Sequence, residues 1–212
     1  MDSDQREILE VDFLFVGAGP ASLVGALHLK NLLNDSNPDL SIAIIEKASE
    51  VGAHSLSGAV VDPVTLNELF PNLSNEDFPF ENEVDKEYMY YLTKKGKLSV
   101  PFIPKPMSHH GCYIASIGKL TRWLEQKCEQ AGIDIFAGFP GSDIIYNNDS
   151  VIGVRTGDQG IDKNGDRKPN FEPGVDIHAK VTFLGEGSRG SLTKKLIKKF
   201  YLMDGKNPQN WA

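Results

Sequence analysis

The sequence predicts an α/β protein whose first unit is a strand, a helix and a second strand. Val11–Val16 is an apolar run with the length and the β-branched and aromatic content of a buried parallel strand. Pro20–Leu33 shows the apolar periodicity of a helix packed on a sheet, and Ser41–Ile45 is a second apolar run. These segments predict a βαβ unit over residues 11–46, with a right-handed crossover.

A glycine-rich turn joins the first predicted strand to the helix. Gly17 allows the tight turn, and Gly19 lets the backbone approach a pyrophosphate, while the helix N-terminus offers free N–H groups and a positive dipole end. Pro20 suits the first helical turn. The sixth position, usually Gly or Ala, is Ser22, which is small enough to keep helix and strand in contact. The motif consists of Gly17, Ala18, Gly19, Pro20, Ala21 and Ser22.

An acidic residue, Glu46, ends the second predicted strand. At this position a carboxylate can accept hydrogen bonds from ribose hydroxyls, and it disfavours the 2′-phosphate of NADP. In this frame the glycine motif predicts a dinucleotide site rather than an ordinary glycine turn. FAD-binding and NAD-binding proteins share such a unit, so the motif alone does not decide between the two cofactors.

A second strand followed by glycines favours FAD. The predicted strand His178–Leu184 runs into Gly185-Glu186-Gly187, after a large insertion. In two-part FAD folds the chain leaves for a substrate region and returns along such a strand, although this segment alone is also compatible with a plain glycine turn. The two parts predict a Rossmann-like two-part FAD-binding fold of the glutathione-reductase type, with the second FAD-proximal strand at 178–187.

The segments between these two parts are predicted as inserted β-hairpins and helices, with the inserted region at about 72–140. The clearest element is an amphipathic helix over Ile117–Ala131, ended by Gly132. The other predicted elements are a short helix Pro63–Phe70, a hairpin of Tyr88–Thr93 and Lys97–Phe102, a rigid non-helical connector Pro101–Pro106, a strand Ile133–Phe136, a hairpin of Asp143–Asn147 and Val151–Thr156, a long loop or ribbon Gly157–Gly174 and a helix Ser191–Tyr201.

Charge and cysteine content exclude several classes of protein. The net charge of −7 argues against general nucleic-acid binding, which needs clustered basic residues. The two cysteines, Cys112 and Cys128, cannot form a disulfide framework or a multi-cysteine metal or iron–sulfur site within this chain. The acidic start shows no targeting peptide, and no apolar run reaches the roughly 18 residues of a membrane-spanning helix.

Several long strings resemble the electron-transfer-flavoprotein:ubiquinone oxidoreductase family. They are far more specific than the glycine motif, and the resemblance extends from about Val11 to Phe200. The strings are EKASEVGAHSLSGAVVDP at Glu46–Pro63, HHGCYIASIGKLTRWL at His109–Leu124, GVRTGDQGIDKNGDRKPNFEPGVDIHAK at Gly153–Lys180 and GEGSRGSLTKKLIKKF at Gly185–Phe200.

The resemblance implies a flavoprotein that takes electrons from electron-transfer flavoprotein and passes them to ubiquinone. It implies FAD, and a 4Fe-4S cluster only in the full-length protein. This chain resembles roughly the first third of such an enzyme, a partial FAD-binding domain over 1–212 without the quinone and iron–sulfur domains. Because the segment that closes the FAD fold is absent, we expect the chain to hold FAD weakly or not at all.

The resemblance also implies the cofactor contacts. The glycine motif meets the pyrophosphate, and Glu46 and Lys47 meet the adenosine end. The remaining implied contacts are Gly52, His54, Ser57 and Gly58 beside the ribityl chain and flavin, the backbone of Ile144 over the adenine, and Gly185 and Gly187 from the second strand. No catalytic side chain or metal ligand is expected, because the flavin itself accepts and donates the electrons.

The apolar stretch Val51–Asn72 suggests a membrane contact, since the family dips such a segment into one leaflet; core packing beneath the flavin is at least as compatible with it. The resemblance implies a peripheral or monotopic membrane protein that faces the bacterial cytoplasm or the mitochondrial matrix. Two alternatives stay open: a related flavoprotein dehydrogenase of the nitrogen-fixation electron-transfer type, and an inactive truncated FAD-fold fragment.

Overall fold

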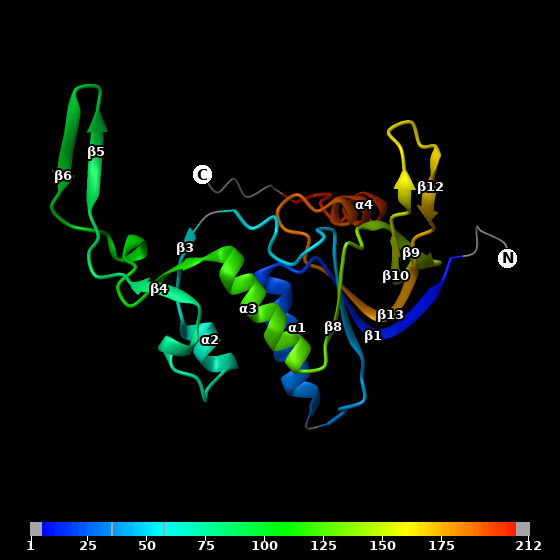
Figure 1. The fold of residues 1–212 in the computed structure, drawn as a ribbon. Helices are drawn as coiled ribbons and strands as arrows, with labels where there is room; N and C mark the ends of the chain where they lie inside the picture. Colours follow the sequence, from blue (N-terminus) through cyan, green and yellow to red (C-terminus); the bar gives the residue numbers. More distant parts are fainter. Residues whose placement is uncertain (1–5, 35, 57, 207–212) are drawn as a thin grey trace.

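A computed structural model describes residues 6–34, 36–56 and 58–206 of the chain. Its centre is a six-stranded sheet with the order β8-β2-β1-β13-β10-β9 (Figure 1). The strands of this sheet are β1 Ile8–Val16, β2 Ile42–Glu46, β8 Asp134–Ala137, β9 Gly141–Asn147, β10 Ser150–Thr156 and β13 Asp176–Leu184.

The two parts predicted from the sequence lie side by side in this sheet. β2 and β13 flank β1 and are both parallel to it, with Val16 of β1 opposite Ile45 of β2 and Leu184 of β13. β8 is parallel to β2, whereas β10 and β9 are antiparallel additions. Because parallel strands end at the same edge of a sheet, the glycine segments that follow β1 and β13 emerge next to each other.

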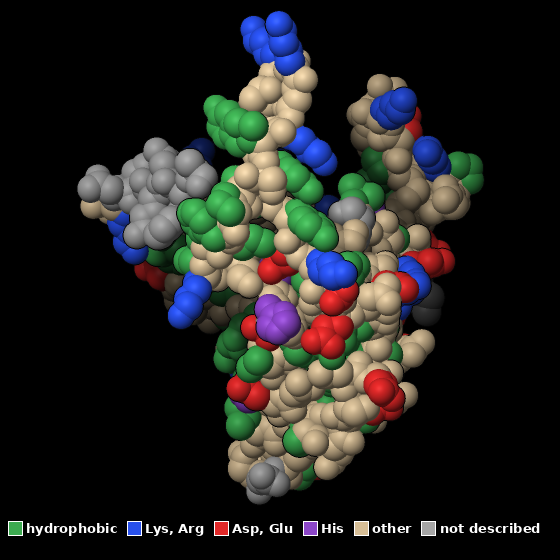
Figure 2. Space-filling model, turned by 90° about the vertical axis from the view of Figure 1, so that its left-hand side faces the viewer, with side chains coloured by type: hydrophobic (Ala, Val, Ile, Leu, Met, Phe, Trp, Pro, Cys, Tyr) green, Lys and Arg blue, Asp and Glu red, His purple; other side chains and the backbone are tan. Residues whose placement is uncertain are grey.

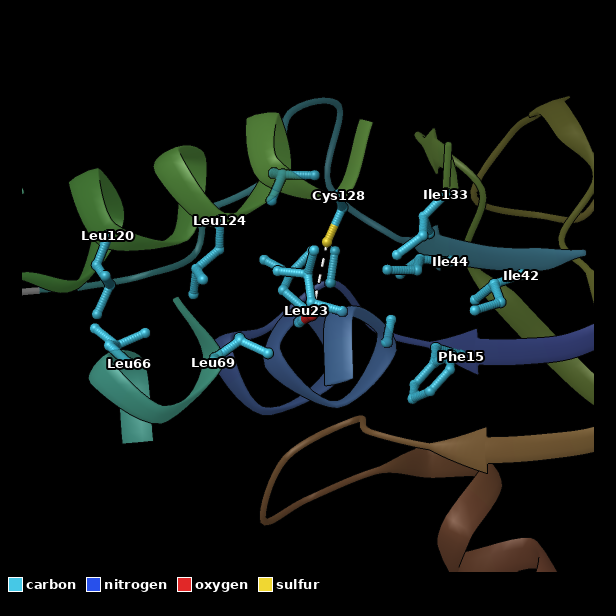
Figure 3. Packing of buried hydrophobic residues seen from close by; sticks show 14 of the residues in the cluster. Phe15, Leu23, Ile42, Ile44, Leu66, Leu69, Leu120, Leu124, Cys128 and Ile133 are labelled. Atoms are coloured by element: carbon cyan, nitrogen blue, oxygen red, sulfur yellow. Dashed lines mark hydrogen bonds between the residues drawn. The ribbon is translucent and has the colours of Figure 1, made fainter. Parts of the chain in front are cut away.

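Helices cover both faces of the sheet. α1 (Pro20–Asn34), α3 (Ile117–Gln130) and α2 (Val64–Leu69) pack on one face, where Leu23, Ile44 and Leu124 are buried together (Figure 3). α4 (Ser191–Lys199) packs on the other face, over a cluster that contains Leu14 and Val154. Successive side chains of a strand point to opposite faces, so the unbroken apolar runs of β1 and β2 supply both clusters.

Cys128 is part of the first cluster rather than a reactive group. Its Sγ lies 3.6 Å from the carbonyl oxygen of Leu23 on α1, a contact drawn in Figure 3. Burial, with smaller contributions from Glu125 and Glu129, raises the pKa of the Cys128 thiol to about 12. The thiol is therefore protonated at neutral pH and acts as a small apolar side chain between α3 and α1.

The predicted helices and hairpins are confirmed with small shifts at their ends. α3 ends before Gly132, which adopts a φ of +75° as a glycine after a helix commonly does. The hairpin of β5 (Met89–Thr93) and β6 (Gly96–Val100) projects from the body, and the stretch Gly157–Gly174 is a ribbon of β11 (Gln159–Ile161) and β12 (Arg167–Glu172) (Figure 1).

Three features differ from the sequence prediction. The connector at 101–106 was predicted to be non-helical, but a 3₁₀ turn, Lys105–Met107, begins inside it behind Pro104. The helix predicted to reach Tyr201 ends at Lys199, because Tyr201 takes a left-handed φ of +52°. A further 3₁₀ turn at Asn75–Asp77, capped by Ser74, lies in a segment for which no element was predicted.

A small antiparallel sheet, with two of its three strands in the inserted region, was not predicted. It has the order β3-β7-β4, formed by Gly58–Val61, Tyr113–Ser116 and Phe80–Glu83. Each strand has only four residues, too few for an alternating pattern to be read. Stacking of the Phe80 and Tyr113 rings, with centroids 4.7 Å apart, joins strands that are distant in sequence.

Within the residues that the structure describes, no helix is long and apolar enough to cross a membrane.

Candidate functional site

A cavity of about 530 Å³ opens where β1, β2 and β13 end. Its walls come from the glycine turn after β1, the loop after β2, the segment after β8 and the turn after β13. The lining residues are Val16, Gly17, Ala18, Gly19, Ile45, Glu46, Lys47, Gly52, His54, Ser55, Phe139, Pro140, Gly141, Gly185, Glu186, Gly187, Arg189, Gly190 and Ser191. The ends of parallel strands at a switch in strand order are the usual ligand site of an open α/β sheet.

The two glycines of the first turn have different surroundings. Gly17 has a φ of +95°, which residues with a side chain rarely adopt. A Cβ there would also lie 2.7 Å from the carbonyl oxygen of Gly185, so both the backbone conformation and this contact exclude a side chain. Gly19 has no atom within 4 Å of an added Cβ and therefore faces open space. Gly17 is required by the fold itself, whereas the bare backbone at Gly19 is free for a ligand to approach.

Ser22 lies where helix α1 crosses the turn after β13. Its side chain is buried, with 4% of its surface exposed, and its hydroxyl has no hydrogen-bond partner among the described residues. A Cβ added to Gly185 would overlap this hydroxyl oxygen. Small residues at both positions therefore let α1 approach the turn after β13, and the hydroxyl of Ser22 lies against Gly185.

Glu46 holds the glycine turn in place. Its Oε2 accepts a hydrogen bond from the backbone N–H of Ala18 (2.8 Å), and its Oε1 accepts one from the backbone N–H of Ala48 (2.9 Å). The sequence prediction gave this carboxylate a role with ribose hydroxyls. The structure adds a role within the protein, because the side chain links the loop after β2 to the turn after β1.

Glu186 has a comparable role at helix α4. Its carboxylate accepts hydrogen bonds from the backbone N–H groups of Leu192 (3.1 Å) and Thr193 (2.7 Å), and from the hydroxyls of Thr193 and Ser191. Burial by itself raises the pKa of Glu186, but these hydrogen bonds outweigh it, so the pKa lies below its usual value. The side chain thus caps α4 and binds the turn after β13 to it.

The structure brings nine of the predicted site residues to one cavity. Pro20, Ala21 and Ser22 do not line it: Pro20 starts α1, and the other two line an apolar groove on the opposite side of the turn. The nine residues at the cavity are Gly17, Ala18, Gly19, Glu46, Lys47, Gly52, His54, Gly185 and Gly187.

Two other predicted site residues, among those that the structure describes, do not line the cavity. Gly58 is the first residue of β3, in the small sheet of the inserted region. Ile144, whose backbone was predicted to cover an adenine, lies in β9, and its side chain is buried in the second core cluster. Ser57 lies outside the described residues.

Sequence reasoning missed several residues that do line the cavity. Phe139, Pro140 and Gly141 follow β8, and Arg189 follows the second glycine segment. The first three could have been found if β8 had been recognised as another parallel strand, since its end must reach the same edge. Arg189 carries no such signal, because its place at the wall depends on how the turn after β13 folds onto α4.

Relatives named for one activity match nearly the whole chain. It is 44% identical over 98% of its length to a probable electron transfer flavoprotein-ubiquinone oxidoreductase of Acinetobacter baylyi. It is 43% identical over 97% of its length to a mitochondrial protein of that name from Arabidopsis thaliana. The chain spans only 37% and 32% of these two proteins, about a third of their length. The resemblance predicted from the sequence is confirmed.

Solved structures confirm the predicted fold. A flavoprotein/dehydrogenase from Cytophaga hutchinsonii matches 96% of this chain and 44% of its own, with a TM-score of 0.55 and 18% identity. A myxobacterial chondrochloren halogenase, described as a variant of FAD-dependent halogenases, matches 88% of this chain and 39% of its own, with a TM-score of 0.57 and 16% identity. No family model matches the chain.

The contact between Ser22 and Gly185 can be tested by a double-mutant cycle. We expect Gly185→Ala alone to lower the free energy of unfolding by about 1–3 kcal/mol, the usual cost of overpacking. In a Ser22→Ala background the same change should cost much less, because the atoms nearest to the new Cβ are then the Cβ at position 22 and the Val16 oxygen, both at 3.4 Å. Urea unfolding of the four proteins measures the coupling. Equal costs in both backgrounds would show that the Ser22 hydroxyl simply rotates away.

The cap on α4 predicts a pH-dependent contribution to stability. The pKa of Glu186 is lower in the folded chain than in the unfolded chain, where it is near 4.5. The ionised carboxylate therefore stabilises the fold fully above pH 4.5, and this stabilisation is lost as the pH falls through the lower pKa of the folded chain. We expect Glu186→Gln to cost about 1 kcal/mol at pH 7, as a lost cap does, and less at pH 4. Urea unfolding at both pH values checks this, and a difference that does not change with pH would contradict it.

Proposed function

We propose that this chain is the FAD-binding part of an electron-transfer-flavoprotein:ubiquinone oxidoreductase. One observation carries the proposal: two glycine segments, at the ends of the adjacent parallel strands β1 and β13, open onto a single cavity. The names of relatives at 39–44% identity support this activity. They do not favour the related dehydrogenase of the nitrogen-fixation type.

The residues at the cavity fit FAD. The open space at Gly19 and the free N–H groups at the start of α1 would receive the pyrophosphate. Glu46 and Lys47 would meet the adenosine end, while Gly52 and His54 would lie toward the ribityl chain and the flavin, together with Ser57 and Gly58. In this proposal residues 1–212 form a partial FAD-binding domain, with the βαβ unit at 11–46, an inserted region at about 72–140 and a second FAD-proximal strand at 178–187.

The chemistry of the proposed function needs little from side chains. Bound FAD would supply the electron acceptor and donor, and the chain binds and orients it through the backbone at Gly17–Gly19 and through Glu46. Electron-transfer flavoprotein would be the electron donor and ubiquinone the acceptor. The 4Fe-4S cluster and the quinone domain of the family are proposed for the rest of a full-length protein, since the relatives are about three times as long as this chain.

A membrane contact would be made by the β5–β6 hairpin and the apolar residues at its base. Tyr91, Leu92 and Leu98 are 68%, 75% and 63% exposed. Lys94 and Lys95 lie in the turn at the tip, and Figure 2 shows basic side chains there above hydrophobic ones. Two-stranded hairpins are marginal in water, and aromatic residues beside lysines suit the interface of an anionic bilayer.

The stretch Val51–Asn72, for which a membrane contact was predicted, is divided by the fold. Val51, Leu66 and Leu69 belong to the core, whereas Leu56 and Val60 are exposed. A groove of about 520 Å³ joins this exposed part to the hairpin, lined by Val60, Val84, Lys86, Glu87, Tyr88, Met89, Tyr90, Ile103, Met107, His109 and Ile114. We therefore propose that the exposed part of 51–72 and the hairpin form one lipid-facing surface.

The cofactor site is tested by Gly19→Val. In the ligand-free chain the new side chain meets open space, so the free energy of unfolding should stay within about 0.5 kcal/mol of the parent value. It would occupy the position of the phosphates, so FAD binding, which we expect to be weak in this chain, should become undetectable. Equilibrium dialysis with FAD measures this. Gly96→Val, in open space at the hairpin, is the matched control and should bind FAD as the parent does. Unchanged FAD affinity in folded Gly19→Val protein would refute the site.

The membrane surface is tested by Leu92→Glu with Leu98→Glu. We expect the parent chain to sediment with vesicles that contain anionic lipid and the double variant to remain in solution, because each carboxylate must lose water to enter the interface. Ile161→Glu, at an exposed apolar position in the β11–β12 ribbon, is the control and should sediment like the parent. Equal sedimentation of all three proteins, or none by the parent, would refute this surface.

A further inference from the structure

The charged side chains around the cavity fall into two groups. Both carboxylates, Glu46 and Glu186, receive hydrogen bonds from backbone N–H groups of the loops that they hold. Both basic residues, Lys47 and Arg189, are exposed at the wall and form no ion pair or hydrogen bond with any of the residues that the structure describes. At this cavity the carboxylates thus bind protein N–H groups, whereas the two cations have no partner among the described residues.

The chain as a whole is acidic, with a net charge of −7. Some basic side chains outside the cavity pair with a nearby carboxylate, as Lys180 does with Asp12 at 2.6 Å and Arg155 with Asp176 at 2.6 Å. The carboxylates nearest to Lys47 and Arg189 along the chain, Glu46 and Glu186, accept hydrogen bonds from loop backbones instead. Both cations are therefore available to an anionic ligand in the cavity.

The sheet topology places the two cations on either side of the glycine turn after β1. Lys47 directly follows β2, and Arg189 follows the glycine turn after β13, while β1 lies between these strands and leads into the glycine turn and helix α1. An anion at the start of α1 would have one cation on each side. Arginine adds a planar fork of donors that matches two oxygens of a phosphate, whereas lysine acts as a point charge.

We propose that Arg189 and Lys47 clamp the diphosphate of the bound dinucleotide from opposite walls, with Lys47 reaching it from the adenosine end, and that Arg189 is the residue that selects a ligand with a diphosphate. The clamp rests on the proposed FAD site and adds to it a side chain that the glycine fingerprint does not contain. The backbone at Gly19 and the α1 N-terminus accept the phosphates, and the two side chains neutralise their charge. Ligands that carry a nucleoside diphosphate therefore bind more tightly than riboflavin, which has none.

The experiment compares Arg189→Gln, Lys47→Gln and the double variant with the parent chain. Lys194→Gln is the matched control. The substitution removes the same charge, and Lys194 is exposed on α4 and is not among the residues that line the cavity. Dissociation constants for FAD, ADP and riboflavin are measured by equilibrium dialysis at low and high salt. Thermal unfolding of each variant confirms that it is folded.

We expect Arg189→Gln to weaken FAD and ADP about tenfold, in line with the loss of a charge-assisted hydrogen bond, and to leave riboflavin unchanged. The dependence of FAD and ADP binding on salt should become shallower with each cation removed, and Lys194→Gln should match the parent. Arg189→Lys should recover part of the affinity, because it restores the charge but not the fork.

Three outcomes overturn the clamp. Arg189→Gln could bind ADP and FAD as Lys194→Gln does, its effect could be the same for riboflavin, or the parent chain could bind neither ADP nor FAD. The last outcome also removes the proposed FAD site. Binding of ADP that depends on Arg189, without any gain in affinity from a flavin, would instead uphold the diphosphate clamp and remove the FAD assignment alone.

Discussion

The close approach of two glycine turns is the constraint on which the rest of the structure depends. The turn after β1 and the turn after β13 touch, since a Cβ at Gly17 would lie 2.7 Å from the Gly185 oxygen and one at Gly185 would overlap the Ser22 hydroxyl. The backbone N–H of Gly185 also donates to the Val16 oxygen at 2.9 Å. This contact lets β13 continue the parallel sheet beside β1, and so both turns face one cavity.

Carboxylates then stabilise the loops that this contact brings together. Glu46 joins the turn after β1 to the loop after β2, and Glu186 joins the turn after β13 to helix α4. Loops with bare glycines would otherwise lose much conformational entropy on folding, and charged hydrogen bonds to their backbone N–H groups offset part of that cost. The same arrangement leaves Lys47 and Arg189 at the wall with no carboxylate partner among the described residues, which favours an anionic ligand.

The inserted region is less compactly packed than the six-stranded sheet and exposes more apolar surface. Its β3-β7-β4 sheet is small, and the β5–β6 hairpin projects from the body with several large apolar side chains in contact with solvent (Figure 1). An exposed apolar surface is unfavourable in water and indicates a binding partner. We propose above that this partner is a lipid interface. The β5–β6 hairpin is thus distant in sequence from the cofactor site, whereas the stretch Val51–Asn72 contributes Gly52 and His54 to that site and Leu56 and Val60 to the proposed lipid-facing surface.

Elements with local signals could be predicted from the amino-acid sequence. The βαβ unit, the strand His178–Leu184 before the second glycine segment and helix α3 with its terminal glycine follow from apolar runs, periodicity and capping, and the structure confirms them. The long strings shared with one family determined the resemblance that the relatives confirm. Such features depend on residues that are close in sequence, and each carries its own signal.

Features that join residues distant in sequence could not be predicted and follow from the three-dimensional fold. The three short strands of the β3-β7-β4 sheet exist because they pair with one another, and Ile144 lies in the core because α4 covers its strand. The direction of the Glu46 carboxylate and the place of Arg189 at the cavity wall depend on which loops the sheet brings together. These contacts stabilise the protein only once the whole sheet has formed. No local pattern in the sequence therefore predicts them.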